Sequence, residues 1–415
     1  MFRQTILLYK NAYSGLSRPI WMQAAVMLIN RAGTMVVPFL TIYLNTALHF
    51  SIAKSGAVLS VYGAGAILGV YIGGKLTDRI GFFPVQFWSL LFNGILFLVL
   101  WRLRGFTEIC ACIFLLSSIG EAFRPANAAA TAYYSKPENR TRSYSLNRLA
   151  VNIGFAVGPA LGGFLAALSY KWLFWTDGCT CIVAAMFLWW QLKPRASGAK
   201  AEAQGAPRAT AAPPDAKAAT EEGPARSPYK DKIFLRFIFL VWVYAIGFFQ
   251  IFSVIPLYYE RVIHLNNVQV GLLFSMNGIL IALLEMVLVY RLENKKPNSV
   301  YISYGVLMHA AAFAVLLICP ALAWVAVFHM LLMTAAEMTS VPFMNSYFVG
   351  RSHEQTRGQY AALYGMAFSA AQVVGPSLGA QVAGFWGFRW LWGILMGVAL
   401  LNYLGFRRLT ASERS

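Results

Sequence analysis

Charged residues are scarce in this chain of 415 residues: Asp, Glu, Lys and Arg make up 12% of it, while 58% is hydrophobic. Soluble globular proteins carry about twice as much charge, roughly 25%. The alternation of apolar and polar positions expected of a membrane β-barrel is also missing, since Ile95–Leu100 and Ile113–Leu116 are apolar on both faces. The composition therefore predicts an all-α membrane protein with many spans.

Several motifs of enzymes and nucleotide-binding proteins are missing as well. No glycine-rich loop ending in Lys-Ser or Lys-Thr occurs, so ATP is not the expected energy source. There is no HExxH motif, and the five cysteines lie in or beside apolar segments as Cys110, Cys112, Cys179, Cys181 and Cys319. Residues i and i+2 of a helix do not face each other, so the two Cys-x-Cys pairs are interpreted as small buried side chains. We predict no enzymatic activity, no cofactor and no metal.

What the chain does contain is long apolar runs of about the 20 residues that a membrane helix needs. The first six are Trp21–Leu44, Gly56–Leu76, Val85–Trp101, Glu108–Ala132, Ser145–Leu168 and Trp172–Gln191. The second six are Ile233–Leu257, Val268–Tyr290, Ser299–Ile318, Ala323–Tyr347, Gln359–Ala383 and Trp390–Phe406. Residues 193–230 lie between the two sets and are rich in Ala, Pro, Gly and charge, which predicts a flexible linker. The expected organisation is a half over 1–192, a linker over 193–230 and a half over 231–415.

Basic residues outnumber acidic ones, 34 to 16, and they are unevenly placed. With twelve spans, 25 Lys and Arg fall on the side of the termini and the linker and three fall inside helices. The opposite side has six, namely Lys54, Arg102, Arg104, Lys171, Arg261 and Arg389. Because cytoplasmic loops collect Lys and Arg, both termini are predicted to be cytoplasmic, in a multi-pass protein of the inner or plasma membrane. The basic excess thus indicates topology, and no nucleic-acid partner is expected.

An internal repeat relates the two sets of spans. Prolines recur at offsets of 217, 217 and 218 residues, in the pairs Pro125 and Pro342, Pro159 and Pro376, and Pro38 and Pro256. Their order is the same in both halves. Two parallel six-helix repeats joined by a linker are the plan of transporters that rock about a site near the middle of the membrane.

The loop after the second span has a recognisable pattern, Gly74-Lys-Leu-Thr-Asp78-Arg79-Ile-Gly81. It resembles the loop between helices two and three of the major facilitator superfamily. The resemblance implies an intracellular latch at Gly74, Asp78, Arg79 and Gly81, with the start of the eleventh helix as partner. Phe82 and Phe83 stand where the family usually has basic residues.

The fifth span contains a second family pattern. Gly154, Gly158, Pro159, Gly162 and Gly163 match the motif of proton-driven exporters in this superfamily. Glycines let helices approach closely, and the proline removes a backbone donor and permits a bend. The resemblance implies a gating role for these five residues; tight packing alone is the other reading.

The resemblance covers the chain outside the linker and is closest to the multidrug-exporter-like, drug:proton antiporter-like branch. It implies the fold of that superfamily, with twelve transmembrane helices in two pseudo-symmetric halves around a central cavity. The first, fourth, seventh and tenth helices of the family line this cavity. One family feature is missing: the fourth span has no early Arg and carries Arg124 instead.

Ionisable side chains inside the spans are the candidates for proton coupling, because a charge at the bilayer centre costs about 2.5–3.5 kcal/mol. Glu121 and Arg124 are i, i+3 in the fourth span, Arg31 lies midway along the first and Glu337 midway along the tenth. We interpret Glu121 or Glu337 as the group that gains and loses a proton, with Arg31 and Arg124 as charge partners. A purely structural ion pair is the alternative.

Other polar and aromatic positions are assigned less specifically. Glu285 in the eighth span faces the cavity, Arg148 or a bound proton, and Arg148 is expected to reach back to the cytoplasm. Asp177, near the outer end of the sixth span, is expected to meet water. The candidates for lining the substrate cavity are Tyr244, Gln250, Phe39 and Tyr43.

These observations predict a secondary transporter that exports small amphiphilic compounds in exchange for protons by alternating access. The alternatives are a proton-coupled importer of a peptide-like or other small metabolite, and a lipid flippase. The expected partners are a small-molecule substrate, protons and the lipid bilayer, and the expected state is a monomer.

Overall fold

The protein is a bundle of long helices, seen here in a computed structural model that describes residues 15–136, 140–192, 228–292, 295–352 and 356–412. No strand occurs within these residues. The first half consists of α2 (Arg18–Ala32), α3 (Val36–Ile42), the π-helical turn η1 (Tyr43–Ala47), α4 (Ile52–Ile80), α5 (Phe82–Leu100), α6 (Phe106–Tyr134), α7 (Arg140–Leu168) and α8 (Tyr170–Leu192). The second half consists of η3 (Pro228–Lys230), α10 (Lys232–Phe248), η4 (Phe249–Phe252), α11 (Val254–Arg261), α12 (Asn267–Leu292), α13 (Asn298–Ile318), α14 (Ala323–Arg351), α15 (Arg357–Phe385) and α16 (Phe388–Ser412).

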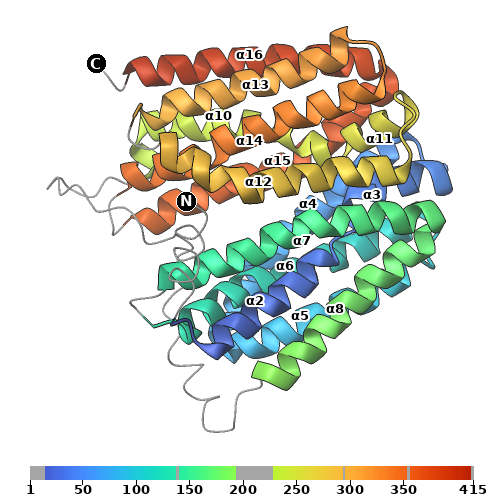
Figure 1. The fold of residues 1–415 in the computed structure, drawn as a ribbon, viewed down its shortest axis with the longest axis vertical. Helices are drawn as coiled ribbons and strands as arrows, with labels where there is room; N and C mark the ends of the chain where they lie inside the picture. Colours follow the sequence, from blue (N-terminus) through green and yellow to red (C-terminus); the bar gives the residue numbers. More distant parts are fainter. Residues whose placement is uncertain (1–14, 137–139, 193–227, 293–294, 353–355, 413–415) are drawn as a thin grey trace, which may run out of the picture.

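The helices confirm the predicted fold class. Eleven helical segments of the described chain are long and apolar enough to cross a membrane, and α15 completes the bundle. Figure 1 shows the two sets of helices as two bodies, with α2–α8 in one and α10–α16 in the other. Large apolar side chains such as Trp190, Phe385 and Ile318 are exposed on the outside, as expected for a surface that faces lipid.

Several predicted spans are shorter than the helices observed. The second helix runs over Ile52–Ile80 and the tenth over Ala323–Arg351, because a helix keeps its backbone hydrogen bonds beyond the apolar segment that hydropathy detects. The turn between α4 and α5 needs Gly81, whose φ of +86° suits glycine. Most of the predicted linker, residues 193–227, lies outside the described residues.

Two spans predicted as continuous are interrupted. The first breaks between Ala32 and Val36, and the seventh changes to the 3-10 turn η4 before α11 begins. Pro38 and Pro256 lie in the first turn of α3 and of α11, respectively. A proline has no N–H to donate one turn back, so each break occurs where the helical ladder already lacks a donor.

The two halves meet along three pairs of helices: the long pairs α7 with α12 and α4 with α15, and the short pair α3 with α11. At the first crossing, a Cβ on Gly271 would lie 2.3 Å from the carbonyl oxygen of Pro159 and 3.1 Å from the Cα of Gly163. At the second, a Cβ on Gly56 would lie 2.7 Å from the carbonyl oxygen of Pro376. The sequence repeat is therefore also a repeat of the contacts between halves, each made by a glycine against a proline turn.

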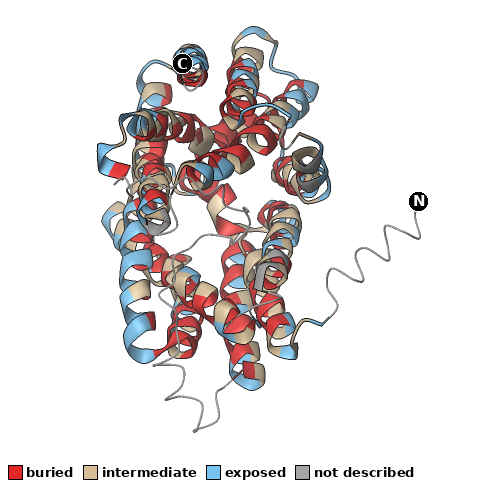
Figure 2. Cartoon of the chain, turned by 90° about the vertical axis from the view of Figure 1, so that its left-hand side faces the viewer, coloured by how far each residue is buried: buried red, intermediate tan, exposed pale blue. Residues whose placement is uncertain are grey.

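The buried cores show where the halves are joined. One core contains residues of both halves, including Phe39 and Tyr43 with Ile255 and Tyr259. It lies around α3 and α11 (Figure 1), at one end of the bundle. The opposite end, where α8 ends and α10 begins, is called the linker end. At the linker end, each half has a core of its own. Figure 2, seen from that end, shows the buried faces turned into each body. The halves are thus packed together on the side away from the linker.

The glycine crossing between α7 and α12 leads to a stability prediction. Gly271→Ala places a methyl group against backbone that cannot move alone, and overpacking of this kind costs about 1–3 kcal/mol. The melting temperature of the purified protein in detergent is expected to fall.

Gly365→Ala in α15 is the matched control, because no atom lies within 4 Å of the added methyl and alanine favours a helix interior. It should leave the melting temperature unchanged or slightly higher. Equal melting temperatures for the two variants would contradict the close approach at Gly271.

Candidate functional site

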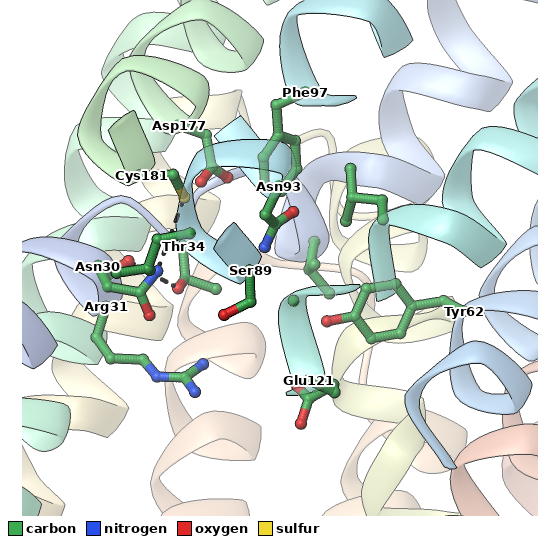
Figure 3. A pocket seen from close by; sticks show the side chains of 14 residues that line it. Asn30, Arg31, Thr34, Tyr62, Ser89, Asn93, Phe97, Glu121, Asp177 and Cys181 are labelled. Atoms are coloured by element: carbon green, nitrogen blue, oxygen red, sulfur yellow. Dashed lines mark hydrogen bonds between the residues drawn. The ribbon is translucent and has the colours of Figure 1, made fainter. Parts of the chain in front are cut away.

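A polar pocket of about 40 Å³ lies inside the first half, among the helices on either side of the break in the first span. Its lining includes Asn30, Arg31, Thr34, Tyr62, Ser89, Asn93, Glu121, Asp177 and Cys181. Figure 3 shows these side chains around one space, drawn from α2, α4, α5, α6 and α8. Two of the predicted charged residues, Arg31 and Glu121, thus line one pocket.

Arg31 comes from the last turn of α2, directly before the break. Its Cζ lies 5.8 Å from the centre of the Phe155 ring on α7, and a cation over an aromatic face is attracted to it. The Nε atom is buried without a hydrogen-bond partner in the described structure. Arg31 is therefore held by packing and faces the pocket with unused hydrogen-bonding capacity.

Glu121 and Arg124 form the ion pair that their spacing predicts. The Glu121 Oε2 to Arg124 Nη2 distance is 2.9 Å, with 13% of the Glu121 side chain and 65% of the Arg124 side chain exposed. The carboxylate thus lies on the pocket side and the guanidinium in a more open position. Arg31 and Arg124 are both available to this one carboxylate.

Glu337 lies in the second half, on α14, away from this pocket. Asn277 of α12 lies beside its carboxylate, and Tyr244 of α10, which is 3% exposed, lies near it. Asn277 also donates to the Thr334 hydroxyl at 3.0 Å. Glu337 and Glu121 are 216 positions apart, so the repeat places one acidic residue at matching levels of α6 and α14.

Glu285 pairs with Arg148 rather than standing alone. The two side chains join α12 to α7 and so cross between the halves. The Glu285 side chain is 10% exposed and the Arg148 side chain 58%. Arg148 therefore has a partner across the interface, and its predicted turn toward the cytoplasm stays a prediction.

Three of the four residues proposed to line a substrate cavity are instead packed in the core or hydrogen-bonded to other segments. Phe39 and Tyr43 belong to the core shared by the halves, and the Tyr43 hydroxyl accepts a hydrogen bond from Arg104 Nη1 at 2.7 Å. Gln250 is fully buried, and its Nε2 donates to the carbonyl oxygen of Gly375 at 2.8 Å. These side chains contact residues far away in the sequence, and such contacts cannot be predicted from the spacing of residues along one helix.

The predicted gating residues form two separate contacts. Gly154 and Gly158 face the end of α2, where a Cβ on Gly154 would lie 2.5 Å from the Cβ of Arg31. Pro159 and Gly163 face α12 as described above, and Gly162 packs beside Met35 and Phe39. The segment thus touches both the break beside the pocket and the interface between halves.

The predicted latch residues lie at the linker end of α4. Gly74 has open space around it, Asp78 and Arg79 are exposed, and Gly81 ends the helix. Within the described residues, no ion pair joins Asp78 to the start of α15. The latch between Asp78 and this helix start therefore stays a prediction.

Asp177 is the pocket residue that sequence reasoning misplaced. It is 2% exposed, and its Oδ2 accepts hydrogen bonds from the N–H groups of Met35 at 3.1 Å and Val36 at 3.0 Å. The expectation that it meets water is therefore wrong. The signal available in the sequence was an acidic residue in an apolar span together with a proline-containing segment that needs its backbone donors satisfied.

A second acidic residue, Asp231, organises the linker end of the second half. It caps α10 by accepting from the N–H groups of Ile233 and Phe234, and it forms an ion pair with Arg351 at the end of α14, 2.6 Å between Oδ2 and Nε. The Tyr360 hydroxyl adds a hydrogen bond at 3.3 Å. Burial disfavours the charged carboxylate, but these partners outweigh burial and hold the pKa of Asp231 below its usual range.

The Asp231–Arg351 pair predicts a pH-dependent stability. Arg351→Gln removes the partner of a half-buried carboxylate and should cost about 1–3 kcal/mol at neutral pH. The folded pKa lies below the unfolded value of about 3.9. The contribution of the pair is therefore present above that value and lost as the pH falls through the folded pKa. Melting curves of wild type and Arg351→Gln should differ at neutral pH and converge in acid.

Arg236→Gln provides the control, because Arg236 is an exposed arginine of α10, the helix that Asp231 caps. Its melting temperature should match wild type at every pH. A gap between wild type and Arg351→Gln that does not change with pH would mean that Arg351 contributes through packing and not through charge.

The family profile of the Major Facilitator Superfamily matches residues 23–368. The chain belongs to this superfamily. Its sequence is 24% identical over 398 residues to a Na(+), Li(+), K(+)/H(+) antiporter of Planococcus maritimus, covering 90% of this chain and 91% of the relative. It is 29% identical over 168 residues to the multidrug resistance protein MdtG of Proteus mirabilis, covering 39% and 42%.

Solved structures share the architecture of this superfamily member. A POT family transporter in complex with 5-aminolevulinic acid superposes with a TM-score of 0.77 at 12% identity, over 96% of this chain and 98% of the other. A bacterial homologue of the human lysosomal transporter Spinster, in an inward-facing and unoccupied conformation, gives 0.73 at 13% identity, over 96% and 98%. At such identities the likeness concerns the fold.

Proposed function

We propose that this superfamily member is a proton-coupled secondary transporter that exports small amphiphilic compounds by alternating access. The observation that carries the proposal is that Arg31 and Glu121, two residues of opposite charge, line one pocket inside the membrane. Charges at this depth are costly, and an ion pair needed only for stability would not require a pocket beside it. With both termini on the cytoplasmic side, the linker end of the bundle faces the cytoplasm.

Glu121, with Arg124 as its ion-pair partner and Arg31 on the same pocket, has a charged and a protonated state. Glu121 pairs with Arg124 in this structure, and Arg31 faces the same pocket from α2. A proton on Glu121 would release Arg124 from this pair, and loss of that proton would restore it. Rocking of the halves would then expose the carboxylate to one side and to the other in turn.

The relatives support the direction and the coupling. The antiporter of Planococcus maritimus aligns with nine-tenths of this chain, and MdtG aligns with about two-fifths of it. Export of amphiphilic compounds and exchange of Na⁺ or Li⁺ for protons are therefore the two cargo hypotheses, and the first is the one that the exporter motif on α7 favours.

Proteoliposomes that contain the purified protein and the trapped pH dye pyranine test the proposal. Ethidium is a permanently charged cation that carries no proton itself. When it is added outside in the absence of a starting pH gradient, exchange predicts that the lumen becomes alkaline. Glu121→Gln, which removes the acidic group, should reduce this signal to that of empty liposomes.

Glu108→Gln is the matched control, because Glu108 lies in the first turn of the same helix α6 and glutamine keeps its capping bond to Gly105. This variant should transport at the wild-type rate. A lumen that becomes acidic would indicate symport and contradict export by exchange. A signal with NaCl or LiCl but not with ethidium would assign the cation cargo instead.

A further inference from the structure

The break in the first membrane helix is held by one charged side chain from a distant segment. Asp177 on α8 accepts the N–H groups of Met35 and Val36 through its Oδ2 atom, at 3.1 Å and 3.0 Å. The interruption between α2 and α3 leaves the N–H of Val36 without a partner in the helix, while the N–H of Met35 is shared with the carbonyl oxygen of Gly33 at 2.7 Å. Inside a bilayer an unpaired backbone N–H is costly, so the geometry of this break depends on Asp177.

The corresponding break in the seventh helix is held without any charge. Gln250 donates through Nε2 to the carbonyl oxygens of Ile246 at 3.0 Å and Gly375 at 2.8 Å, and the Ser253 hydroxyl donates to its Oε1 at 3.1 Å. The residue 217 positions after Asp177 is Ile394. The titratable group beside this second break is His309, which is hydrogen-bonded to the backbone of Gly247. The acceptor and donors at Gln250 and Ser253 are neutral, whereas the acceptor at the first break is a carboxylate.

Asp177 also has access to the pocket. It is part of the pocket lining (Figure 3), and its Oδ1 atom accepts no hydrogen bond from a described residue. The Oδ1 of Asn93 on α5 is buried beside the same space and has no partner in the described structure. One oxygen of the carboxylate is thus committed to the backbone of the first helix, while the other remains available.

Charged and titratable groups face Asp177 from several elements. Arg31 lies on α2, Tyr62 on α4, Glu121 with its partner Arg124 on α6, and Cys181 one turn away on α8. The lining from α5 is neutral, with Ser89 and Asn93 as its polar groups, and α3 contributes the apolar Val37. The positive groups balance the two carboxylates, so a proton added to Asp177 changes the balance in the pocket.

We propose that Asp177 is a proton-binding site that couples protonation of the pocket to the break in the first helix. A proton binds at Oδ1 and converts the carboxylate to a neutral acid, with no other bond formed or broken. Hydrogen bonds to a charged acceptor are about twice as strong as those to a neutral one. The two bonds to Met35 and Val36 therefore weaken, and α2 and α3 become free to change their mutual angle. This inference rests on the proton-coupled transport proposed above.

Amide hydrogen exchange of the purified protein, followed by mass spectrometry over a range of pH and corrected for intrinsic rates, tests the site directly. Peptides across the first break should lose protection as the pH falls, by about ten-fold at Met35 and Val36. Peptides across residues 249–258 provide an internal control, because the neutral side chains of Gln250 and Ser253 hold that break. Equal behaviour of the two breaks in the wild-type protein would overturn the proposal.

Two variants separate Asp177 from its neighbours. Asp177→Asn keeps an oxygen acceptor but takes up no proton, so exchange at the first break should no longer depend on pH. Asp177→Glu keeps the acid and should retain the dependence, and so should Glu121→Gln. If Asp177→Asn retained the wild-type dependence, the titrating group would be another one. Exchange is measured without transport, so a failed liposome assay with pH-dependent exchange would reject the transport hypothesis and leave the site standing.

Discussion

Backbone hydrogen bonds inside a bilayer have no water to turn to, so each interruption of a membrane helix must be satisfied by the protein itself. This constraint explains why the first and seventh helices, which break near Pro38 and Pro256, are tied to segments far away in the sequence. Asp177 supplies the acceptor for one break and Gln250 the donor for the other. The two helices can thus bend without exposing polar backbone to lipid, and both lie where the halves must move against each other.

Close backbone packing also joins the two halves where their helices cross. Gly271 approaches the backbone of Pro159, and Gly56 approaches the backbone of Pro376 and the methyl group of Ala380. Contacts between small residues hold helices together by close packing rather than by apolar side chains, which lipid would solvate equally well. Smooth surfaces of this kind can slide or tilt, whereas the ion pair of Arg148 and Glu285 adds one specific attachment across the interface. The core around α3 and α11 packs the halves together at the end away from the linker.

Much of this fold could be predicted, because hydropathy, proline spacing and glycine motifs are local. Twelve spans in two sets, the repeat offset and the pairing of Glu121 with Arg124 all follow from residues a few positions apart or from direct repetition. The site was harder to predict from the sequence. Gln250 and Tyr43 are polar residues of helices that line the cavity in the family, yet both are hydrogen-bonded to residues far away in the sequence. Asp177 was missed because its partners are 141 and 142 positions away, and only the folded chain shows which backbone donors lack acceptors.

The first half differs from the second in having its charged pocket beside the break of its first helix. The repeat gives both halves an acidic residue at matching levels, Glu121 and Glu337. In the first half Arg31 and Asp177 line the same pocket as Glu121, and Arg124 pairs with Glu121. In the first half the charged pocket adjoins the break of its first helix, whereas the break of the second half is held by the neutral side chains of Gln250 and Ser253. Because Arg31 ends α2 and Asp177 holds the start of α3, the charged pocket and the bend of the first helix are one physical unit. A change of protonation there must alter the helix, and through Gly154 it must also alter α7, which forms the crossing with the other half.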